Sequence, residues 1–287
     1  MTDPTPLARF LLINPFRLPA GSRFIHRPVE GPKEVQLVNY KDIEHVLSDV
    51  DWDFHPGPET THGDWSAANR EEFAFVASDR LKIVRQACES GKYDAIVLLG
   101  GAEPGFQDAR EIGKSFHIPV TACAFAQMHI ASMLGDRFSV IDLYEAHAKY
   151  FAGIVVQHRF TERCASIRNI EYPLPRPGVE DEFPVRIQRE KAMAGEHSEM
   201  LEACVRQAVA AIEEDGAEVL IFGCSATYWL RPFLQRRLQD LGWDVPVLEG
   251  QAAAIQLAKL LLGLRLNASG LTFPASRPAR TRHKILP

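Results

Sequence analysis

The chain has 287 residues, a formal net charge of −5 at pH 7 and 46% hydrophobic residues. This length suits one large or two smaller domains, and acids and bases spread through the main body exclude the basic stripe of a nucleic-acid-binding protein. No apolar run approaches the roughly 18 residues of a membrane span, and the N-terminus lacks a basic segment leading into an apolar one. We therefore expect a cytoplasmic protein that binds neither nucleic acid nor membranes.

Strand-like and helix-like segments alternate along the chain, which predicts an α/β fold with parallel sheets. In chain order we expect a strand at 9–14, a helix at 42–47, a strand at 50–55, a helix at 65–90, a strand at 95–99, a helix at 104–114 and a strand at 119–123. Next come a helix at 124–134, a strand at 137–142, a helix at 144–158 and a strand at 167–172. They are followed by a helix at 188–214, a strand at 218–222, a helix at 230–240, a strand at 245–248 and a last helix at 251–262. Proline-rich loops are expected at 17–33 and 173–184, and a solvated basic tail ends the chain with Arg277, Arg280, Arg282, His283 and Lys284.

The order of the segments suggests two similar halves. Asp94 lies six residues before Gly100, and Glu218 lies six residues before Cys224. In both halves a long helix precedes this strand, and a helix and a Pro-Val strand follow it. We therefore predict two pseudo-symmetric three-layer α/β halves with parallel sheets, formed by residues 1–123 plus 249–287 and by residues 124–248. Ligands bind at the carboxyl ends of parallel strands, so the active site is expected in the cleft between the halves.

Cys224 is the strongest candidate for a chemically active residue. It follows the apolar strand that ends at Phe222 and precedes a helical segment. Backbone N–H groups at a helix start favour a thiolate, which is typical of a reactive rather than a packed cysteine. The corresponding turn of the first half, Leu99 to Gly105, carries no thiol.

The other reactive side chains give no sign of a metal site or a disulfide framework. No CxxC pair occurs among the five cysteines, which are Cys88, Cys123, Cys164, Cys204 and Cys224. The histidines show no paired-ligand spacing such as HExxH, so no catalytic metal is predicted.

Other site types match less well. The turn from Leu99 to Gly105 is not GxGxxG, and no P-loop motif occurs, which disfavours a nucleotide cofactor. Gly223-Cys224-Ser225 lacks the second glycine of a GxSxG nucleophile turn. Acyl transfer by a cysteine and a histidine distant in the sequence stays open.

An ordered set of segments resembles the aspartate/glutamate/hydantoin racemase superfamily, and most closely its hydantoin racemase branch. The segments span roughly residues 9–263 and are Ile13–Pro15, Gly57–Gly63, Ala102–Glu111, Pro119–Val120 with Met128–His129, Leu134–Ile141, Gly216–Cys224 and Pro246–Ala253.

This resemblance implies an enzyme that works without a metal or an organic cofactor. In the family, a cysteine from each half flanks the substrate carbon; one thiolate removes a proton α to a carbonyl, and the other thiol returns one on the opposite face. Hydrogen bonds must stabilise the developing enolate. Backbone N–H groups in the turns that begin at Gly100 and Cys224 would provide them, from Gly101, Ala102, Ser225, Ala226 and Thr227.

The chain departs from the family pattern at Gly100, which stands at the first-half cysteine position. A glycine holds no proton, so two-thiol racemisation is in doubt. The single second-half cysteine resembles the arylmalonate decarboxylase branch, in which one thiol protonates one face after loss of CO2. Decarboxylation, isomerisation and racemisation therefore all stay open, with Cys224 as acid and base.

Two residues are candidates to replace the missing thiol. Cys123 ends a predicted strand and would either face the cleft or fill the core. Asp142 also ends a strand, where it would act as a base, bind a cationic group or simply be solvated. Asn14, in the Ile-Asn-Pro segment, is expected to hydrogen-bond the ligand. Further candidates are Glu103, which also suits a helix cap, together with His62, Phe125, Tyr228 and Trp229. The 17–33 loop would form a lid or a subunit contact.

The sequence thus predicts a racemase-superfamily isomerase or decarboxylase that transfers a proton at a carbon α to a carbonyl or carboxylate of a small molecule. The alternatives are a non-catalytic small-molecule binding protein on the same fold, or cysteine-dependent acyl transfer or hydrolysis. A homo-oligomer is left open.

Overall fold

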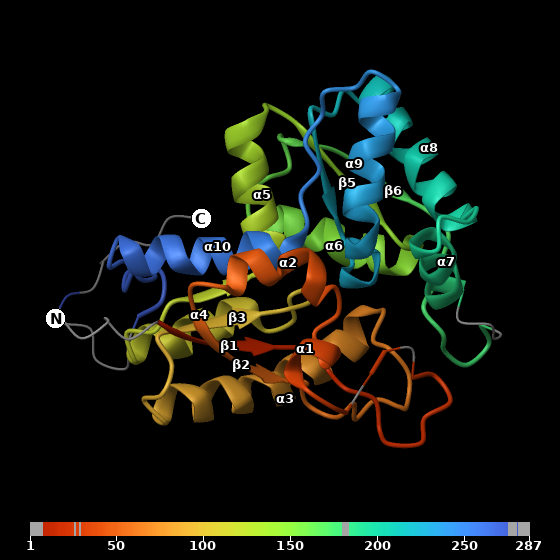
Figure 1. Cartoon of the computed structure of the whole chain (residues 1–287). Coiled ribbons are helices and arrows are strands. Elements are labelled where there is room, and N and C mark those ends of the chain that lie inside the picture. The colour runs from red at the N-terminus through yellow and green to blue at the C-terminus, as the bar shows by residue number, and fades with distance from the viewer. Residues whose placement is uncertain (1–7, 26, 29, 180–183, 275–279, 281–287) are drawn as a thin grey trace, which may run out of the picture.

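The computed structural model describes residues 8–25, 27–28, 30–179, 184–274 and 280. The chain forms two halves, each with its own parallel sheet, and helix α10 (Gly250–Gly263) runs between them (Figure 1). Most of the predicted basic tail, including Arg277, Arg282, His283 and Lys284, lies outside the described residues. Within the described part, every helix is too short or too polar to traverse a lipid bilayer.

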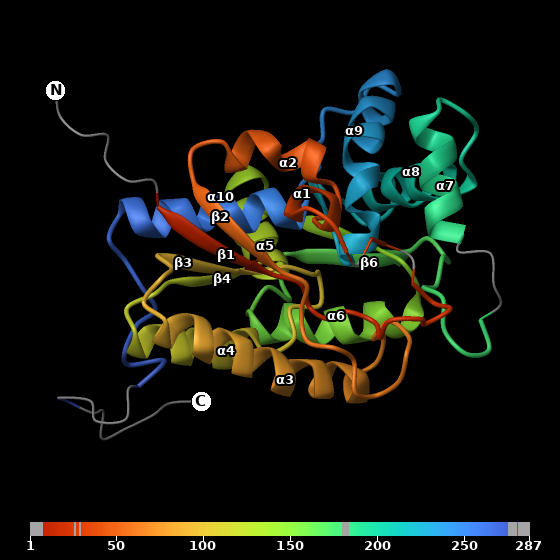
Figure 2. The same cartoon turned by 60° about the horizontal axis from the view of Figure 1, so that its bottom comes forward.

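The first half contains a four-stranded sheet in the order β2-β1-β3-β4. Its strands are all parallel and are β1 (Arg9–Ile13), β2 (Asp51–His55), β3 (Ala95–Leu98) and β4 (Val120–Ala122). On one face lie α3 (Arg70–Glu89) and α4 (Phe106–Ser115), and on the other lie α10 and α2 (Tyr40–Leu47), which the short α1 (Lys33–Gln36) precedes (Figure 2).

The apolar side chains of these strands alternate between the two faces, as a strand requires. Phe10 and Leu12 belong to the core under α2 and α10, whereas Leu11 and Ile13 pack in the core that includes Val84 of α3. Both faces are therefore covered, which explains why β1 is apolar without interruption.

The second half contains a three-stranded parallel sheet in the order β6-β5-β7. Its strands are β5 (Phe138–Asp142), β6 (Cys164–Asn169) and β7 (Val219–Phe222). Its helices are α5 (Cys123–Leu134), α6 (Glu145–Gln157), α7 (Pro184–Met193), α8 (Glu199–Glu213) and α9 (Arg231–Asp240), and a 3₁₀ helix, η1 (Ser225–Leu230), follows β7.

The predicted α/β fold with two parallel sheets is confirmed, and two segment predictions are wrong. The long helix expected at 188–214 is divided into α7 and α8, because the chain turns at Gly195 with a φ of 74°. The strand expected at 245–248 makes only a single bridge, between Val247 and Leu220. The residue boundaries proposed for the two halves stay a prediction.

Candidate active site

A cavity of about 510 Å³ lies at the carboxyl ends of the strands, where the two halves meet. Asn14 follows β1, Gly100 to Ala102 follow β3, and Cys224 to Ala226 follow β7, and all of these residues line the cavity. The volume suits a small organic molecule. The structure thus brings together most of the residues that the sequence singled out.

Cys224 is the residue that precedes η1, in extended conformation, and 7% of it is exposed. Among the described residues, the backbone N–H groups of Ser225 and Ala226 have no acceptor, as expected at the start of a helix. The same holds for Gly101 and Ala102 in the first half. The thiol therefore lies beside unpaired donors that suit an anion.

His147, in the first turn of α6, is the main site residue that sequence reasoning missed. Its Nδ1 lies 2.8 Å from Oδ2 of Asp142, and both side chains are buried. Oδ1 of Asp142 accepts a hydrogen bond of 2.7 Å from the backbone N–H of Leu143. The signal in the sequence was an acid at a strand end with a histidine five residues later, across the strand-to-helix turn.

The charge on His147 depends on its two neighbours. Burial lowers the pKa of His147, but the charges of Asp142 and of the Cys224 thiolate, with hydrogen bonds to both, raise it, and the net pKa lies well above the usual value. Asp142 does not line the cavity but binds the imidazole, whereas His147 and Cys224 both line it.

Gly223 makes room for this arrangement. A Cβ at this position would lie 2.5 Å from the carboxyl carbon of Asp142. The carboxylate therefore packs directly on the backbone that leads into Cys224. Only glycine allows the acid, the imidazole and the thiol to approach each other in this way.

The first-half turn cannot carry a side chain without strain. Gly100 has a φ of 98°, and a Cβ there would lie 2.9 Å from the ring of Pro15. The next residue, Gly101, packs so closely against the second half that its Cβ would overlap the carbonyl oxygen of Gly223. Gly100 thus carries no thiol, and its backbone conformation suits only glycine.

Two buried side chains fix the strand ends around the cavity. The guanidinium of Arg80 donates to the backbone carbonyls of Ile13 and Leu99, the latter at 2.7 Å, and so joins the ends of β1 and β3. The amide of Gln127 donates to the carbonyl of Phe222 at 3.0 Å and accepts from its N–H at 3.1 Å. The turns that hold Gly100 and Cys224 are therefore anchored on rigid elements.

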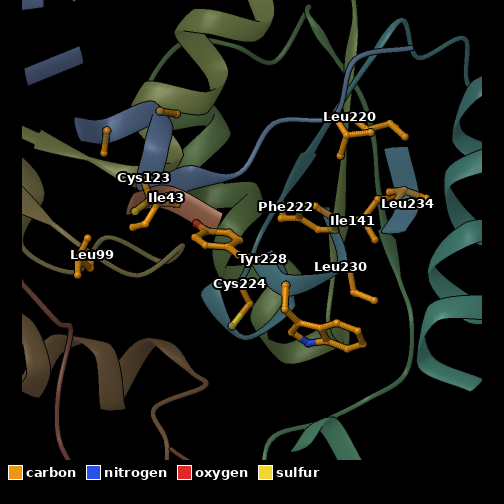
Figure 3. Packing of buried hydrophobic residues seen from close by; sticks show 14 of the residues in the cluster. Ile43, Leu99, Cys123, Ile141, Leu220, Phe222, Cys224, Tyr228, Leu230 and Leu234 are labelled. Carbon is orange, nitrogen blue, oxygen red and sulfur yellow. The ribbon is translucent and has the colours of Figure 1, made fainter. Parts of the chain in front are cut away.

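Cys123 and Thr227 lie away from the cavity wall. Cys123 is fully buried, its Sγ lies 3.7 Å from the carbonyl oxygen of Leu98, and burial raises its pKa strongly. Figure 3 shows Cys123 beside the hydroxyl of Tyr228, whereas the side chain of Cys224 points away from that ring. The hydroxyl of Thr227 donates to the carbonyl of Cys224 at 2.6 Å, and its backbone N–H donates there at 3.0 Å. Thr227 therefore shapes the turn.

The remaining candidates from the sequence lie in different parts of the structure. Trp229 lines the cavity, and Tyr228 lines a second cavity of about 370 Å³ behind η1. Glu103 is buried, accepts the N–H of Phe125 at 2.9 Å and contacts His158. His62 pairs with the backbone carbonyl of Trp65 at 3.1 Å, outside the cavity.

Three further residues of the cavity wall were not predicted. Arg27 comes from the proline-rich loop, Asn39 precedes α2 and Gln251 lies in the first turn of α10. No motif marks them, because they belong to segments far apart in the sequence. Among the described residues, no cluster of three or more His, Cys, Asp or Glu side chains could hold a metal ion.

Comparisons with known proteins agree with this architecture. The sequence profile of a family described as Asp/Glu/Hydantoin racemase matches residues 55–258. The hydantoin racemase of Rhizobium meliloti is 28% identical over 190 residues, which cover 66% of this chain and 68% of that protein. Allantoin racemase from Klebsiella pneumoniae superposes with a TM-score of 0.67 at 22% identity, over 96% of this chain and 97% of that chain.

Arylmalonate decarboxylase superposes with a TM-score of 0.52 at 16% identity, over 88% of this chain and 92% of that chain. At such identities the two solved structures show a shared fold. The family profile, in contrast, spans more than half of the sequence. The resemblance noted in the sequence is thereby confirmed, and the chain is an enzyme of the Asp/Glu/hydantoin racemase family.

Proposed function

We propose that this enzyme transfers a proton at a carbon next to a carbonyl or carboxylate, with Cys224 as the group that gives or takes the proton. One observation carries the proposal: Cys224 and His147 both line the cavity, and Asp142 binds His147, whose pKa is raised. Weak carbon acids need a positioned base and donors for the enolate oxygen. The N–H groups of Gly101 and Ala102 and of Ser225 and Ala226 would provide those donors.

The transfer is proposed to occur on one face of the carbon. Cys224 is the only cysteine among the described residues of the cavity wall, and Gly100 supplies no second thiol. A carbanion formed by loss of CO2 needs a proton on one side only. In that reaction the carbon–carboxyl bond breaks, its electron pair stays on the carbon, and the Cys224 thiol donates its proton there. His147 or solvent then returns a proton to the sulfur.

A substrate panel in D2O tests the proposal. The panel contains 5-substituted hydantoins, allantoin and arylmalonates, which are the compounds that give the similar proteins their names. Simple 2-substituted carboxylic acids are added to it. Nuclear magnetic resonance follows deuterium at the α carbon, and a gas sensor follows CO2. Deuterium in recovered substrate supports isomerisation, and gas with deuterated product supports decarboxylation. Absence of both signals with every compound contradicts the proposal.

Cysteine-dependent acyl transfer is the second candidate, because Cys224 and His147 line the same cavity and Asp142 binds His147. A cysteine, a histidine and an acid in this order also activate a thiolate for attack on a carbonyl. Such a reaction forms a thioester at Cys224 and releases the leaving group with a proton from His147. Intact-protein mass spectrometry with activated esters would detect that adduct, whereas proton transfer leaves the mass unchanged.

A further inference from the structure

Arg27 places a positive charge on the wall of the cavity. It belongs to the loop before α1, and its guanidinium carbon lies 5.4 Å from the centre of the Phe16 ring. One of its nitrogens, Nη2, donates a hydrogen bond to the backbone carbonyl of Phe16. A guanidinium has five N–H donors in a planar fork, and among the described residues Arg27 uses one nitrogen in this hydrogen bond.

No carboxylate among the described residues forms an ion pair with Arg27. Burial lowers the pKa of Arg27 to about 10, and the nearby Cys224 thiolate partly opposes that change. The side chain is therefore still charged at neutral pH. The cavity wall therefore offers a partly buried cation that has no carboxylate partner among the described residues.

Asn39 adds a neutral hydrogen-bonding group to the same wall. Only 6% of the residue is exposed, and neither its amide oxygen nor its amide nitrogen has a partner among the described residues. Its backbone is in the left-handed region, with a φ of 65°. An unpaired buried amide destabilises the folded protein, and this cost is offset if a ligand supplies the missing hydrogen bonds.

The wall near α1, α7 and η1 carries a group of apolar side chains, which are Val35, Leu37, Leu174, Val185, Met193 and Trp229. The charged side chains of Glu34, Arg186 and Arg189 also line the cavity there. A ligand that complements Arg27, the apolar side chains and Asn39 has an anionic group, an apolar body and a neutral polar group.

We propose that the cavity binds an organic acid whose carboxylate pairs with Arg27, whose apolar body lies against this wall and whose neutral polar group reaches Asn39. This proposal rests on the proposed function and specifies the substrate class of the same site. A carboxylate held by a cation is stabilised as an anion, which opposes its loss as neutral CO2. Arg27 therefore holds a carboxylate that the product retains.

Binding measurements on the Cys224→Ser variant test the proposal without turnover. The probes are three acids and their neutral amides: phenylacetate, cyclohexylacetate and hexanoate with phenylacetamide, cyclohexylacetamide and hexanamide. Isothermal titration at pH 7 should show at least one acid bound roughly tenfold or more tightly than its amide, because a charge-assisted hydrogen bond is replaced by a neutral one.

Arg27→Gln should abolish that preference, and Arg27→Lys should keep part of it because the charge remains. Arg23→Gln is the matched control, because Arg23 lies in the same loop, is exposed and does not line the cavity. Thermal unfolding checks that each variant is folded. Equal binding of acid and amide in all three pairs overturns the proposal, and so does a preference that survives Arg27→Gln.

The two proposals fail in different ways. A preference for acids in the Cys224→Ser protein, with no turnover of any panel compound, supports the role of Arg27 and contradicts the proton transfer. Turnover in the panel with no preference for acids contradicts the role of Arg27 alone.

Discussion

Nδ1 of His147 lies 2.8 Å from Oδ2 of Asp142, with both side chains buried and His147 in the wall of the cavity that Cys224 also lines. This hydrogen bond fixes the orientation of the ring and leaves Nε2 as the nitrogen available to the sulfur. The acid and the imidazole thus come from one turn, between β5 and α6, while the thiol comes from the turn after β7. We infer that His147 is a positioning residue, which acts on the reaction through Cys224.

Asp142→Asn should lower the turnover number of the enzyme by roughly 10- to 100-fold, the range found when the carboxylate behind a functional histidine is removed. The Michaelis constant should change little, because Asp142 does not line the cavity. His147→Gln should have a similar effect, and the double variant should be no worse than the worse single one, since residues in one network are not additive. Steady-state kinetics on the four proteins would measure this, and additive losses would contradict the network.

The stability of the protein should depend on pH through His147. Because its pKa is raised in the folded protein, the stabilisation is complete below the unfolded value of about 6.5. It falls as pH rises and is lost above the folded pKa, by up to about 1.4 kcal/mol per pH unit. Urea unfolding of the wild type and His147→Gln between pH 6 and 9 should show the difference shrinking. A difference that is constant or grows with pH is incompatible with a raised pKa.

Gly100→Cys should not create a second proton carrier. The new Cβ would lie 2.9 Å from the Pro15 ring at a φ of 98°, so the variant should lose about 1–3 kcal/mol of unfolding free energy. Gly153→Ala is the control, because Gly153 lies in α6 with open space around its Cβ position. Chemical unfolding and chiral analysis of the products check both expectations. A stable Gly100→Cys protein that racemises its substrate would show that the turn is more adaptable than its geometry implies.

Iodoacetamide should modify Cys224 before any other cysteine at neutral pH. Its thiol faces a cavity and a protonated imidazole, whereas burial raises the pKa of Cys88 to about 11 and likewise that of Cys164. Peptide mass spectrometry would give the order of modification, and a bound ligand should protect Cys224. Cys164→Ser serves as a control that leaves the fast reaction unchanged. Modification of Cys224 no faster than that of the other cysteines, with no protection by ligand, would contradict its role as the proton carrier.

The sequence predicted the elements and the position of Cys224 because strand ends and glycine turns are local features. It also placed Asn14, Gly101 and Ala102 at the cavity, since the carboxyl ends of parallel strands meet there. It did not predict the hydrogen bond between Asp142 and His147, because that contact depends on the direction that α6 takes after β5. Arg27 and Asn39 were missed for a related reason: their roles arise only when an irregular loop folds over a site formed by other segments.

The central claim is that a single sulfur carries the proton, on one side of the substrate carbon. The most direct measurement is the stereochemistry of deuterium at that carbon after reaction in D2O, compared between the wild type and Cys224→Ser. Deuterium should enter one face only, and Cys224→Ser should lower the rate roughly 10²- to 10⁴-fold, the usual contribution of a positioned acid or base. Label on both faces at equal rates, or an undiminished rate in Cys224→Ser, would contradict the account.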